Sequence, residues 1–331
     1  MKVVIQVPCL NEEETLPAVL DSIPREIPGV DELEIVVIDD GSTDRTGEVA
    51  LAHGAHHVLR HTTTMGLARS FRDGVEHALA HGADIVVNTD GDNQYPQERI
   101  PDLVAPILAG KAEIVIGDRQ TRTIAHFSPF KKQMQRLGSW VVNRAARTEL
   151  PDAASGFRAY SRYSLYRLNI VTRFSYTMET IIQAGNKRLA IDSVPIHTNP
   201  KTRESRLFSN MWVHMAQSAK AILRSYLMYR PWTVFALLAV VFGVVGLSPF
   251  VRYAILLLQG DQGNHFQSLI LGTLLLVGSL LSLALGVLSD LQRTNRTLQE
   301  DLLERMKEQQ FGPARPATGL GAGPQPSTEA P

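Results

Sequence analysis

The sequence predicts an α/β fold with a mostly parallel sheet, followed by a hairpin of two membrane-spanning helices. Short apolar runs rich in β-branched residues alternate with helical patterns in the first half of the chain, which is typical of a parallel sheet. Several of these runs end in acidic residues. Two apolar runs after residue 230 lack charged residues, and each has the length that crosses the hydrocarbon core of a bilayer.

The expected elements alternate in order along the chain. Apolar runs predict strands, and capping residues with apolar residues at helical spacing predict helices. Strands are expected at 2–7, 33–38, 57–60, 83–89, 112–116 and 189–195, and helices at about 13–22, 45–54, 66–82 and 174–184.

Composition limits the classes of function. The chain has 331 residues and a formal net charge of +0, which argues against general nucleic-acid binding because that requires a basic surplus. Its one cysteine, Cys9, excludes an intramolecular disulfide and is expected to be a small core residue. The apolar run at the N-terminus is too short for a signal peptide.

The strand expected at 83–89 ends in Asp90, Asp92 and Gln94. These oxygen-bearing side chains would lie at the carboxyl end of a strand, where open α/β sheets bind ligands. Mg²⁺ commonly shares its ligands between one or two carboxylates and a substrate phosphate. The segment therefore predicts a metal–diphosphate site, and the alternative is a polar turn whose side chains cap backbone groups.

Four histidines occur close together, but we do not expect a zinc site from them. They straddle the end of a helix and a strand, so they need not share a face, and none is accompanied by a cysteine. They are His53, His56, His57 and His61.

The C-terminal part predicts a membrane anchor. Aromatic and basic residues in 206–230 favour an interfacial amphipathic helix, for which a surface helix packed on the domain is the alternative. Lys and Arg flank the two spans but are absent from the loop between them, so both flanks are expected to be cytoplasmic. The expected organisation is a catalytic domain at 1–205, the interfacial region at 206–230, two transmembrane helices within 231–290 (about 232–255 and 267–289), a cytoplasmic helix at 291–310 and a disordered tail at 311–331.

Four motifs in order carry a resemblance to a known family. They are VPCLNEE at 7–13, VIDDGSTD at 37–44, TDGDNQYP at 89–96 and SGFR at 155–158. Together they resemble family 2 glycosyltransferases with the GT-A fold, whose catalytic domain is Rossmann-like. The same motif order followed by two membrane helices resembles the polyprenyl-phosphate glycosyltransferases, which include dolichyl-phosphate mannose or glucose synthases and bacterial undecaprenyl-phosphate relatives.

The resemblance implies a role for each motif in binding a nucleotide sugar. Asp90, Asp92 and Gln94 would bind Mg²⁺ or Mn²⁺ against the donor diphosphate, and Asp90 would also contact the donor. Arg119 would lie near the donor. The residues that would hold the base and ribose are Pro8, Asn11, Glu12 and Asp39.

The resemblance also implies a basic segment before the membrane that closes over the donor and acceptor phosphates, formed here by Arg203 and Arg206 with Ser205. Further candidates for the lipid phosphate are Lys131, Lys132 and Arg136. One position departs from the family pattern: many relatives carry Asn two residues before the glycine that opens the third helix, and here Thr64 precedes Gly66.

The implied reaction is an inverting transfer of a sugar to polyprenyl phosphate. A phosphate monoester has a second pKa near 6 and is mostly dianionic at neutral pH, so a strong general base is unnecessary. The expected catalytic residues are Asp92, Arg203 and Arg206, with Asp152 as a candidate base or orienting carboxylate. The segment around Arg203 resembles that of relatives that use UDP-sugars, which implies a UDP-sugar, and GDP-mannose is the alternative donor.

Two other functions stay open. The same donor site could serve a different lipid acceptor, such as a diacylglycerol or a lipid-linked glycan, and a hydroxyl acceptor would need a real base. A membrane scaffold that binds nucleotide without turnover is the second alternative. The sequence does not fix the oligomeric state, and a homo-oligomer is among the options.

Overall fold

A computed structural model describes residues 1–120, 139–140, 142–144, 146–170, 176–200, 231–259 and 266–314. The chain divides into two compact units, one formed by residues up to 222 together with those from 302 onward, and the other by residues 223–301. Each unit is described separately below.

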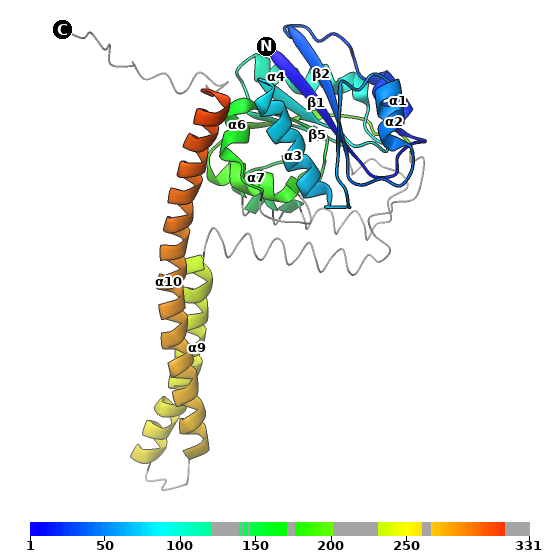
Figure 1. The fold of residues 1–331 in the computed structure, drawn as a ribbon. Helices are drawn as coiled ribbons and strands as arrows, with labels where there is room; N and C mark the ends of the chain where they lie inside the picture. The colour runs from blue at the N-terminus through cyan, green and yellow to red at the C-terminus, as the bar shows by residue number, and fades with distance from the viewer. Residues whose placement is uncertain are drawn as a thin grey trace, which may run out of the picture. The chain divides into compact units, whose positions relative to one another are not determined.

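The first unit is built on a mixed sheet, whose strands in the described part of the chain follow the order β3-β2-β1-β4-β6-β5-β7 (Figure 1). All neighbouring strands pair in parallel except β6, which is antiparallel to both β4 and β5. The predicted mostly parallel α/β fold is confirmed. The strands are β1 (Lys2–Cys9), β2 (Glu32–Asp39), β3 (His57–Arg60), β4 (Ile85–Asn88), β5 (Ile114–Asp118), β6 (Arg158–Ser161) and β7 (Ile191–Pro195).

Helices cover both faces of this sheet, which explains why its central strands are almost continuously apolar. On one face, alternate residues of β1, β2 and β4 join α1 (Leu16–Ser22) and α4 (Ile100–Leu108) in the main core. Cys9 belongs to this core, as expected, and burial raises the pKa of its thiol. On the other face, Phe71 of α3 (Leu67–Ala80) stacks on Tyr176 at a ring distance of 4.1 Å.

The described part of the first unit also contains α2 (Thr46–Ala52), the 3₁₀ turn η1 (Gln97–Arg99), α6 (Arg162–Arg167) and α7 (Tyr176–Asn186). The last turns of α10 (Phe266–Phe311) also belong to this unit, because Lys307 donates hydrogen bonds of 3.0–3.1 Å to the carbonyls of Leu165, Tyr166 and Leu168. A cation at these carbonyls satisfies the C-terminal end of α6 and complements its dipole.

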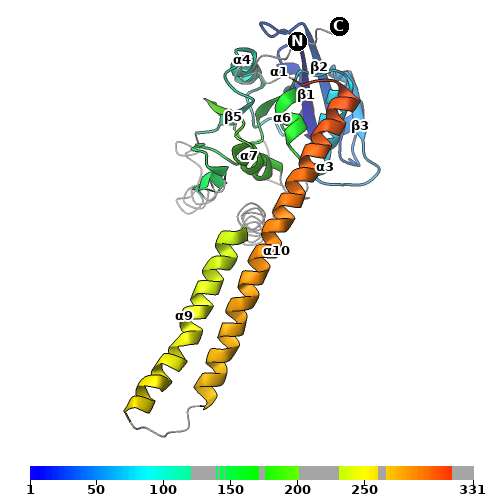
Figure 2. The same ribbon diagram turned by 90° about the vertical axis from the view of Figure 1, so that its left-hand side faces the viewer.

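The second unit contains two long helices, α9 (Pro231–Leu258) and α10 (Phe266–Phe311). Both are long and apolar enough to cross a membrane. They run side by side in opposite directions (Figure 2), and Ser279 donates a 2.7 Å hydrogen bond to the carbonyl of Ala239. A Cβ added to Gly246 would lie 3.0 Å from the carbonyl oxygen of Gly272, a close approach that is typical of membrane helix pairs.

One observation differs from the expected division of this region. The second apolar run and the charged segment that follows it form one continuous helix, α10, rather than two separate elements. The charged segment is rich in strong helix formers and has i,i+4 pairs such as Arg296 with Glu300. The helix therefore continues from the apolar run into the charged segment. The interfacial region expected at 206–230 lies outside the described residues.

Candidate active site

The order in which the chain adds strands to the sheet reverses between β1 and β4, and the candidate site lies at the carboxyl ends of these two strands. β2 and β3 lie on one side of β1, and the strands that follow β4 in the chain lie on its other side. Loops on the two sides of such a switch point diverge and leave a crevice that binds ligands in open α/β sheets. The loops after β1, β2 and β4 carry the acidic motifs that the sequence singles out.

The turn after β2 is held by short hydrogen bonds around Asp39. The backbone N–H of Ser42 donates to Asp39 Oδ1 at 2.8 Å, and the N–H of Thr43 donates to Asn11 Oδ1 at 2.8 Å. Asn11 has a positive φ of 56°, a conformation that Asn tolerates better than most residues. In the described residues, the buried Asp39 Oδ2 has no hydrogen-bond donor and only a 3.5 Å ion pair with Arg60. The arrangement leaves a buried acceptor at the expected nucleotide position.

Pro8 and Glu12 lie at the carboxyl end of β1 and in the loop after it. Pro8 is buried opposite Ile38 of β2, beyond the point at which pairing with β4 stops at Gln6. A proline is tolerated there because β1 has only one neighbouring strand at that level. The N–H of Glu12 donates to Thr46 at 2.9 Å, which ties the β1 loop to the start of α2.

The carboxyl group of Asp90 is the most perturbed acid of the site. The residue is half-buried, but its carboxyl group is enclosed by protein, and this burial together with the charge of Asp92 raises its pKa to about 7. The nearby Arg119 lowers the pKa only in part. Gln94 donates from its side-chain nitrogen to Asp92 Oδ2 at 2.5 Å, so in this structure Gln94 orients the second carboxylate. Two adjacent carboxyl groups that resist joint ionisation form a site that a cation would stabilise.

Two glycines allow the loops to approach this carboxyl group. A Cβ added to Gly156 would lie 3.2 Å from Asp90 Oδ2, and one added to Gly91 would lie 2.7 Å from Cys9 Sγ and 3.4 Å from Glu12 Cγ. The segment at 152–158, the β1 loop and the β4 loop therefore converge on Asp90. Any larger residue at either glycine would push the loops apart.

Asp152 and Arg119 form a bidentate ion pair. Arg119 donates from Nε and Nη2 to the two carboxylate oxygens at 2.7 and 3.0 Å, and the Asp152 side chain is only 2% exposed. Burial acts to raise the pKa of Asp152, but the hydrogen bonds and charge of Arg119 dominate and hold it below its usual value. A carboxylate in this state is a weak base, so these contacts favour the orienting role over the proton-accepting role.

Arg158 holds the 152–158 segment in place through hydrogen bonds to its backbone, a role that the sequence does not reveal. The side chain is fully buried, and it donates to the carbonyls of Ala153, Ser155 and Thr177 at 3.0, 2.7 and 2.8 Å. Tyr95 supports the same segment, because its hydroxyl accepts a 2.9 Å hydrogen bond from the N–H of Gly156.

A second unexpected residue is Asp40, which holds the loop between β3 and α3. Its two carboxylate oxygens accept hydrogen bonds of 2.8 Å from the N–H groups of Met65 and Gly66, and His61 Nδ1 lies 2.7 Å from Oδ1. The acidic pair in the sequence signals both residues, but only the fold separates their roles: Asp39 accepts a hydrogen bond within the turn after β2, and Asp40 holds the loop near Thr64.

The basic residues expected to bind phosphates, and the serine expected beside them, lie outside the described residues. They are Lys131, Lys132, Arg136, Arg203, Ser205 and Arg206. Their assignment stays a prediction.

The four histidines of the sequence have different partners. His53 pairs with Asp21, His57 with Glu34, and His61 with Asp40 and Asp73. The fourth, His56, accepts a 3.0 Å hydrogen bond from a β2 backbone N–H.

Comparison with known proteins identifies the family of this chain. The family model described as glycosyl transferase family 2 matches residues 4–168, which include β1 to β6 and α6. The chain is 30% identical over 176 residues to an undecaprenyl-phosphate mannosyltransferase of Micrococcus luteus, a match that covers 51% of this chain and 70% of the relative. It is 32% identical over 202 residues to a dolichyl-phosphate hexose transferase of Haloferax volcanii, covering 60% of this chain and 82% of the relative.

A solved structure resembles the fold as well. The glucosyl-3-phosphoglycerate synthase of Mycobacterium tuberculosis, crystallised with Mn²⁺ and UDP-glucose, superposes with a TM-score of 0.51 and 28% sequence identity. The match covers 68% of this chain and 78% of that chain.

Proposed function

Because this chain belongs to glycosyl transferase family 2, we propose that it is a membrane-bound enzyme that moves a sugar from a nucleotide sugar to polyprenyl phosphate. Two of its relatives are named as a transferase for undecaprenyl phosphate and a transferase for dolichyl phosphate, which supports this acceptor. The observation that carries the proposal is the convergence of three loops on the Asp90 carboxyl at the switch point of the sheet.

The donor diphosphate would bind through Mg²⁺ or Mn²⁺ at Asp90, Asp92 and Gln94. The donor set fits, because these are oxygen ligands of the kind that hard cations prefer, and joint ionisation of the two carboxyl groups is unfavourable without a cation. Gln94 now donates to Asp92, and its amide oxygen is the atom that a cation would use. When bound, such a cation stabilises negative charge on the leaving diphosphate.

The nucleoside would bind beside the turn after β2. Asn11, Glu12 and Pro8 form or border the β1 loop, and the buried Asp39 Oδ2 is an acceptor suited to a donor N–H or hydroxyl of the nucleoside. An unmet buried acceptor costs about 1–3 kcal/mol, so a ligand donor placed there contributes affinity.

Arg119 would contact the donor phosphates or the sugar, with Asp152 setting its orientation. A guanidinium held on one edge by a bidentate carboxylate keeps its remaining N–H donors in a fixed plane. Asp152 would thus be a positioning residue for Arg119.

The acceptor would need positioning more than proton removal. A phosphate oxygen of polyprenyl phosphate attacks the anomeric carbon of the sugar as the bond to the nucleoside diphosphate breaks, which inverts the anomeric configuration. The attacking phosphate needs no proton removed. Lys131, Lys132, Arg136, Arg203 and Arg206 are proposed to hold the two anions together, with Ser205 on the donor.

The helices α9 and α10 would hold the enzyme at the bilayer that contains its lipid substrate. We propose that residues 1–205 form the catalytic domain and that it lies on the cytoplasmic side together with both termini. The distribution of Lys and Arg at the ends of the two helices supports this orientation.

The donor nucleotide is proposed as UDP, with GDP-mannose as the second candidate. The solved neighbour was crystallised with a UDP-sugar, whereas the relative from Micrococcus luteus is named a mannosyltransferase. These two observations point in different directions, so the experiment must include both donors.

A donor screen tests the proposal. Full-length protein in detergent would receive undecaprenyl or dolichyl phosphate, Mg²⁺ or Mn²⁺, and radiolabelled UDP- and GDP-sugars, with transfer of label into the organic phase as the readout. Asp92→Ala should abolish transfer, whereas Asp102→Ala should not, because Asp102 is an exposed α4 residue paired with Arg99. Nucleotide binding without transfer to any polyprenyl phosphate would overturn the proposal and favour another lipid acceptor or a non-catalytic scaffold.

A further inference from the structure

A second group of metal-ligating side chains lies at the opposite end of the sheet from the candidate active site. Glu34 is near the start of β2, His57 is the first residue of β3, and His77 lies in the last turns of α3. The acidic motif residue Asp39 is at the other end of β2. This Glu34–His57–His77 cluster is therefore separate from the donor site.

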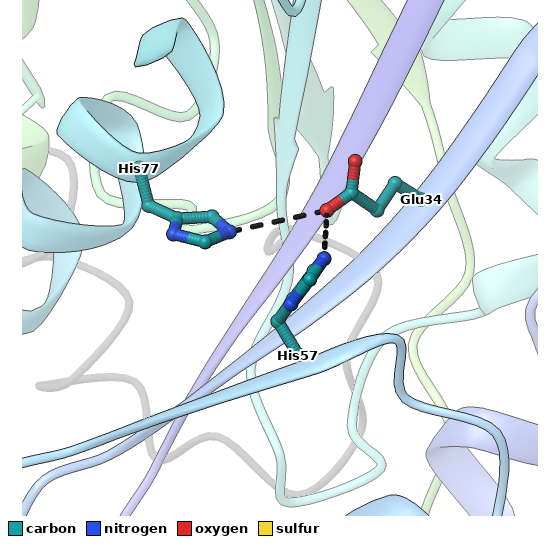
Figure 3. A group of neighbouring side chains, drawn as sticks. All are labelled: Glu34, His57 and His77. Atoms are coloured by element: carbon teal, nitrogen blue, oxygen red, sulfur yellow. Dashed lines mark ion pairs between the residues drawn. The ribbon is translucent and has the colours of Figure 1, made fainter. Parts of the chain in front are cut away.

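The three side chains converge on one point. Glu34 Oε1 lies 2.9 Å from His57 Nε2 and 3.9 Å from His77 Nε2, and all three atoms lie within 4.8 Å of one another. Figure 3 shows both imidazole rings directing a nitrogen at the same carboxylate oxygen. The residues come from two strands and a helix, so the tertiary fold assembles the cluster.

The converging atoms are buried without adequate hydrogen bonds. Glu34 is only 6% exposed, and among the described residues neither its Oε1 nor His77 Nε2 has a hydrogen-bond partner. The 2.9 Å approach of His57 to Oε1 is a close ion-pair contact, but it does not have the geometry of a hydrogen bond. Polar atoms that are buried and unpaired in this way commonly indicate a missing ligand.

The charges around the cluster allow a cation. Lys2 lies 2.6 Å from Glu34 Oε2, the other oxygen of the carboxylate, so Oε1 remains directed at the histidines. Burial acts to raise the pKa of Glu34, but Lys2, His57 and His81 lower it overall. Burial and the neighbouring rings of His81 and His57 lower the pKa of His77.

We propose that Glu34, His57 and His77 form a site for a transition-metal divalent cation of the Zn²⁺ class. Two imidazoles and one carboxylate are a common protein donor set for Zn²⁺, with a further position open to water. The His57 side chain is 44% exposed, which gives an ion access from solvent. His81 lies outside the set and stacks on His77 at a ring distance of 3.9 Å, which fixes the ring plane.

The geometry requires only small adjustments. Zn²⁺ binds imidazole nitrogen and carboxylate oxygen at about 2.0–2.2 Å, so a bound ion would hold the donor atoms a little over 3 Å apart. The separations of 2.9 and 3.9 Å bracket that value, and rotation of exposed His57 can supply the difference. The ion would link β2, β3 and α3 at the end of β2 away from Asp39, so its site would be separate from that of sugar transfer.

Zinc titration of the full-length protein tests the site. The protein would be purified in detergent without a histidine tag, stripped with chelator and titrated with Zn²⁺ by calorimetry in excess Mg²⁺, which occupies the donor site. The matched pair of variants is His57→Gln and His53→Gln, because both histidines are partly exposed and paired with one carboxylate, but only His57 belongs to the cluster.

The expected result is one tight Zn²⁺ equivalent in the wild type and in His53→Gln, with a rise in melting temperature on binding. His57→Gln should bind at least about a hundredfold more weakly, because loss of a supporting contact alone costs 10–100-fold. Equal zinc affinity in the two variants, or no tight equivalent in the wild type, would overturn the proposal and leave a buried ion-pair cluster. The melting temperatures of the metal-free variants show whether both are folded.

Discussion

Replacing Asp152 with Asn tests whether this carboxylate positions Arg119 or accepts a proton. The change preserves the shape of the side chain but removes the charge opposite a guanidinium that is only 21% exposed. Removing one partner of a buried ion pair costs about 3–5 kcal/mol, and because Asn keeps one acceptor oxygen we expect about 3 kcal/mol. At about 2–4 °C per kcal/mol for a domain of this size, the melting temperature should fall by about 6–12 °C.

The coupling between the two side chains can be measured directly. Arg119→Gln should destabilise the protein as well, since it leaves Asp152 buried without its cation. The double variant Arg119→Gln with Asp152→Asn should lose less than the sum of the single variants, because two amides can hydrogen bond to each other. All three variants should raise the KM for the nucleotide sugar, because each misplaces or removes the Arg119 guanidinium.

The pH dependence gives an independent check. The pKa of Asp152 is lower in the folded protein than in the unfolded chain, so the ion pair stabilises the fold fully above the unfolded pKa of about 3.9. This contribution is lost as the pH falls through the folded pKa. The difference in melting temperature between wild type and Asp152→Asn should therefore be constant from about pH 5 upward and shrink only in stronger acid.

A different result would refute the positioning role. Suppose that Asp152→Asn melts within about 1 °C of the wild type, which is a smaller change than a destabilisation of about 1 kcal/mol would cause. If this variant also binds the donor normally, the ion pair does not hold the fold. If it also loses kcat by about 10²–10⁴-fold while Arg119→Gln does not, Asp152 acts as a general base. That outcome would favour a hydroxyl acceptor over a lipid phosphate.

Three further predictions concern the donor site. Asp90→Asn should raise the melting temperature of the metal-free protein, and by more at pH 8 than at pH 5, because the pKa of Asp90 is raised to about 7 and its ionisation costs progressively more stability as the pH rises toward that value. Mn²⁺-dependent donor binding, measured by calorimetry, should be lost, and retained binding would remove Asp90 from the ligand set. Gly156→Ala should weaken Mn²⁺ binding about tenfold or more by displacing the Asp90 carboxylate, and unchanged affinity in the same titration would show that the loop can move. Arg158→Met should lower the melting temperature by at least about 6 °C, because it removes the hydrogen bonds that the guanidinium donates to three buried backbone carbonyls, whereas the exposed Arg99→Met should change it little.

The parallel part of the fold could be predicted because its signals are local. The runs at β1, β2 and β4 are β-branched, buried on both faces and ended by acidic turns, so each can be recognised within about ten residues. Strand β6 could not be found in this way. It has four residues, pairs antiparallel to β4 and β5, and includes Arg158, whose charge hides its burial.

In the candidate site, too, the residues with a local sequence signal could be predicted and the pairs that only the fold brings together could not. Asp90 and Asp92 are recognisable because they end a strand. The pairing of Arg119 with Asp152 joins residues 33 positions apart, and no spacing rule connects them. The cluster of Glu34, His57 and His77 was missed for the same reason, since the sequence grouped His57 with its chain neighbours rather than with β2 and α3.

The balance of charge at the switch point links the stability of the fold to its proposed activity. Asp90 has Asp92 and Glu12 nearby, and both raise its pKa, while the two arginines that lower it are engaged elsewhere: Arg119 with Asp152, and Arg158 with backbone carbonyls. The ligand-free protein therefore holds an anionic site that destabilises it at neutral pH. A cation that binds there with the diphosphate would be attracted by these carboxylates. The loops that Arg158 and Tyr95 already fix would not have to move.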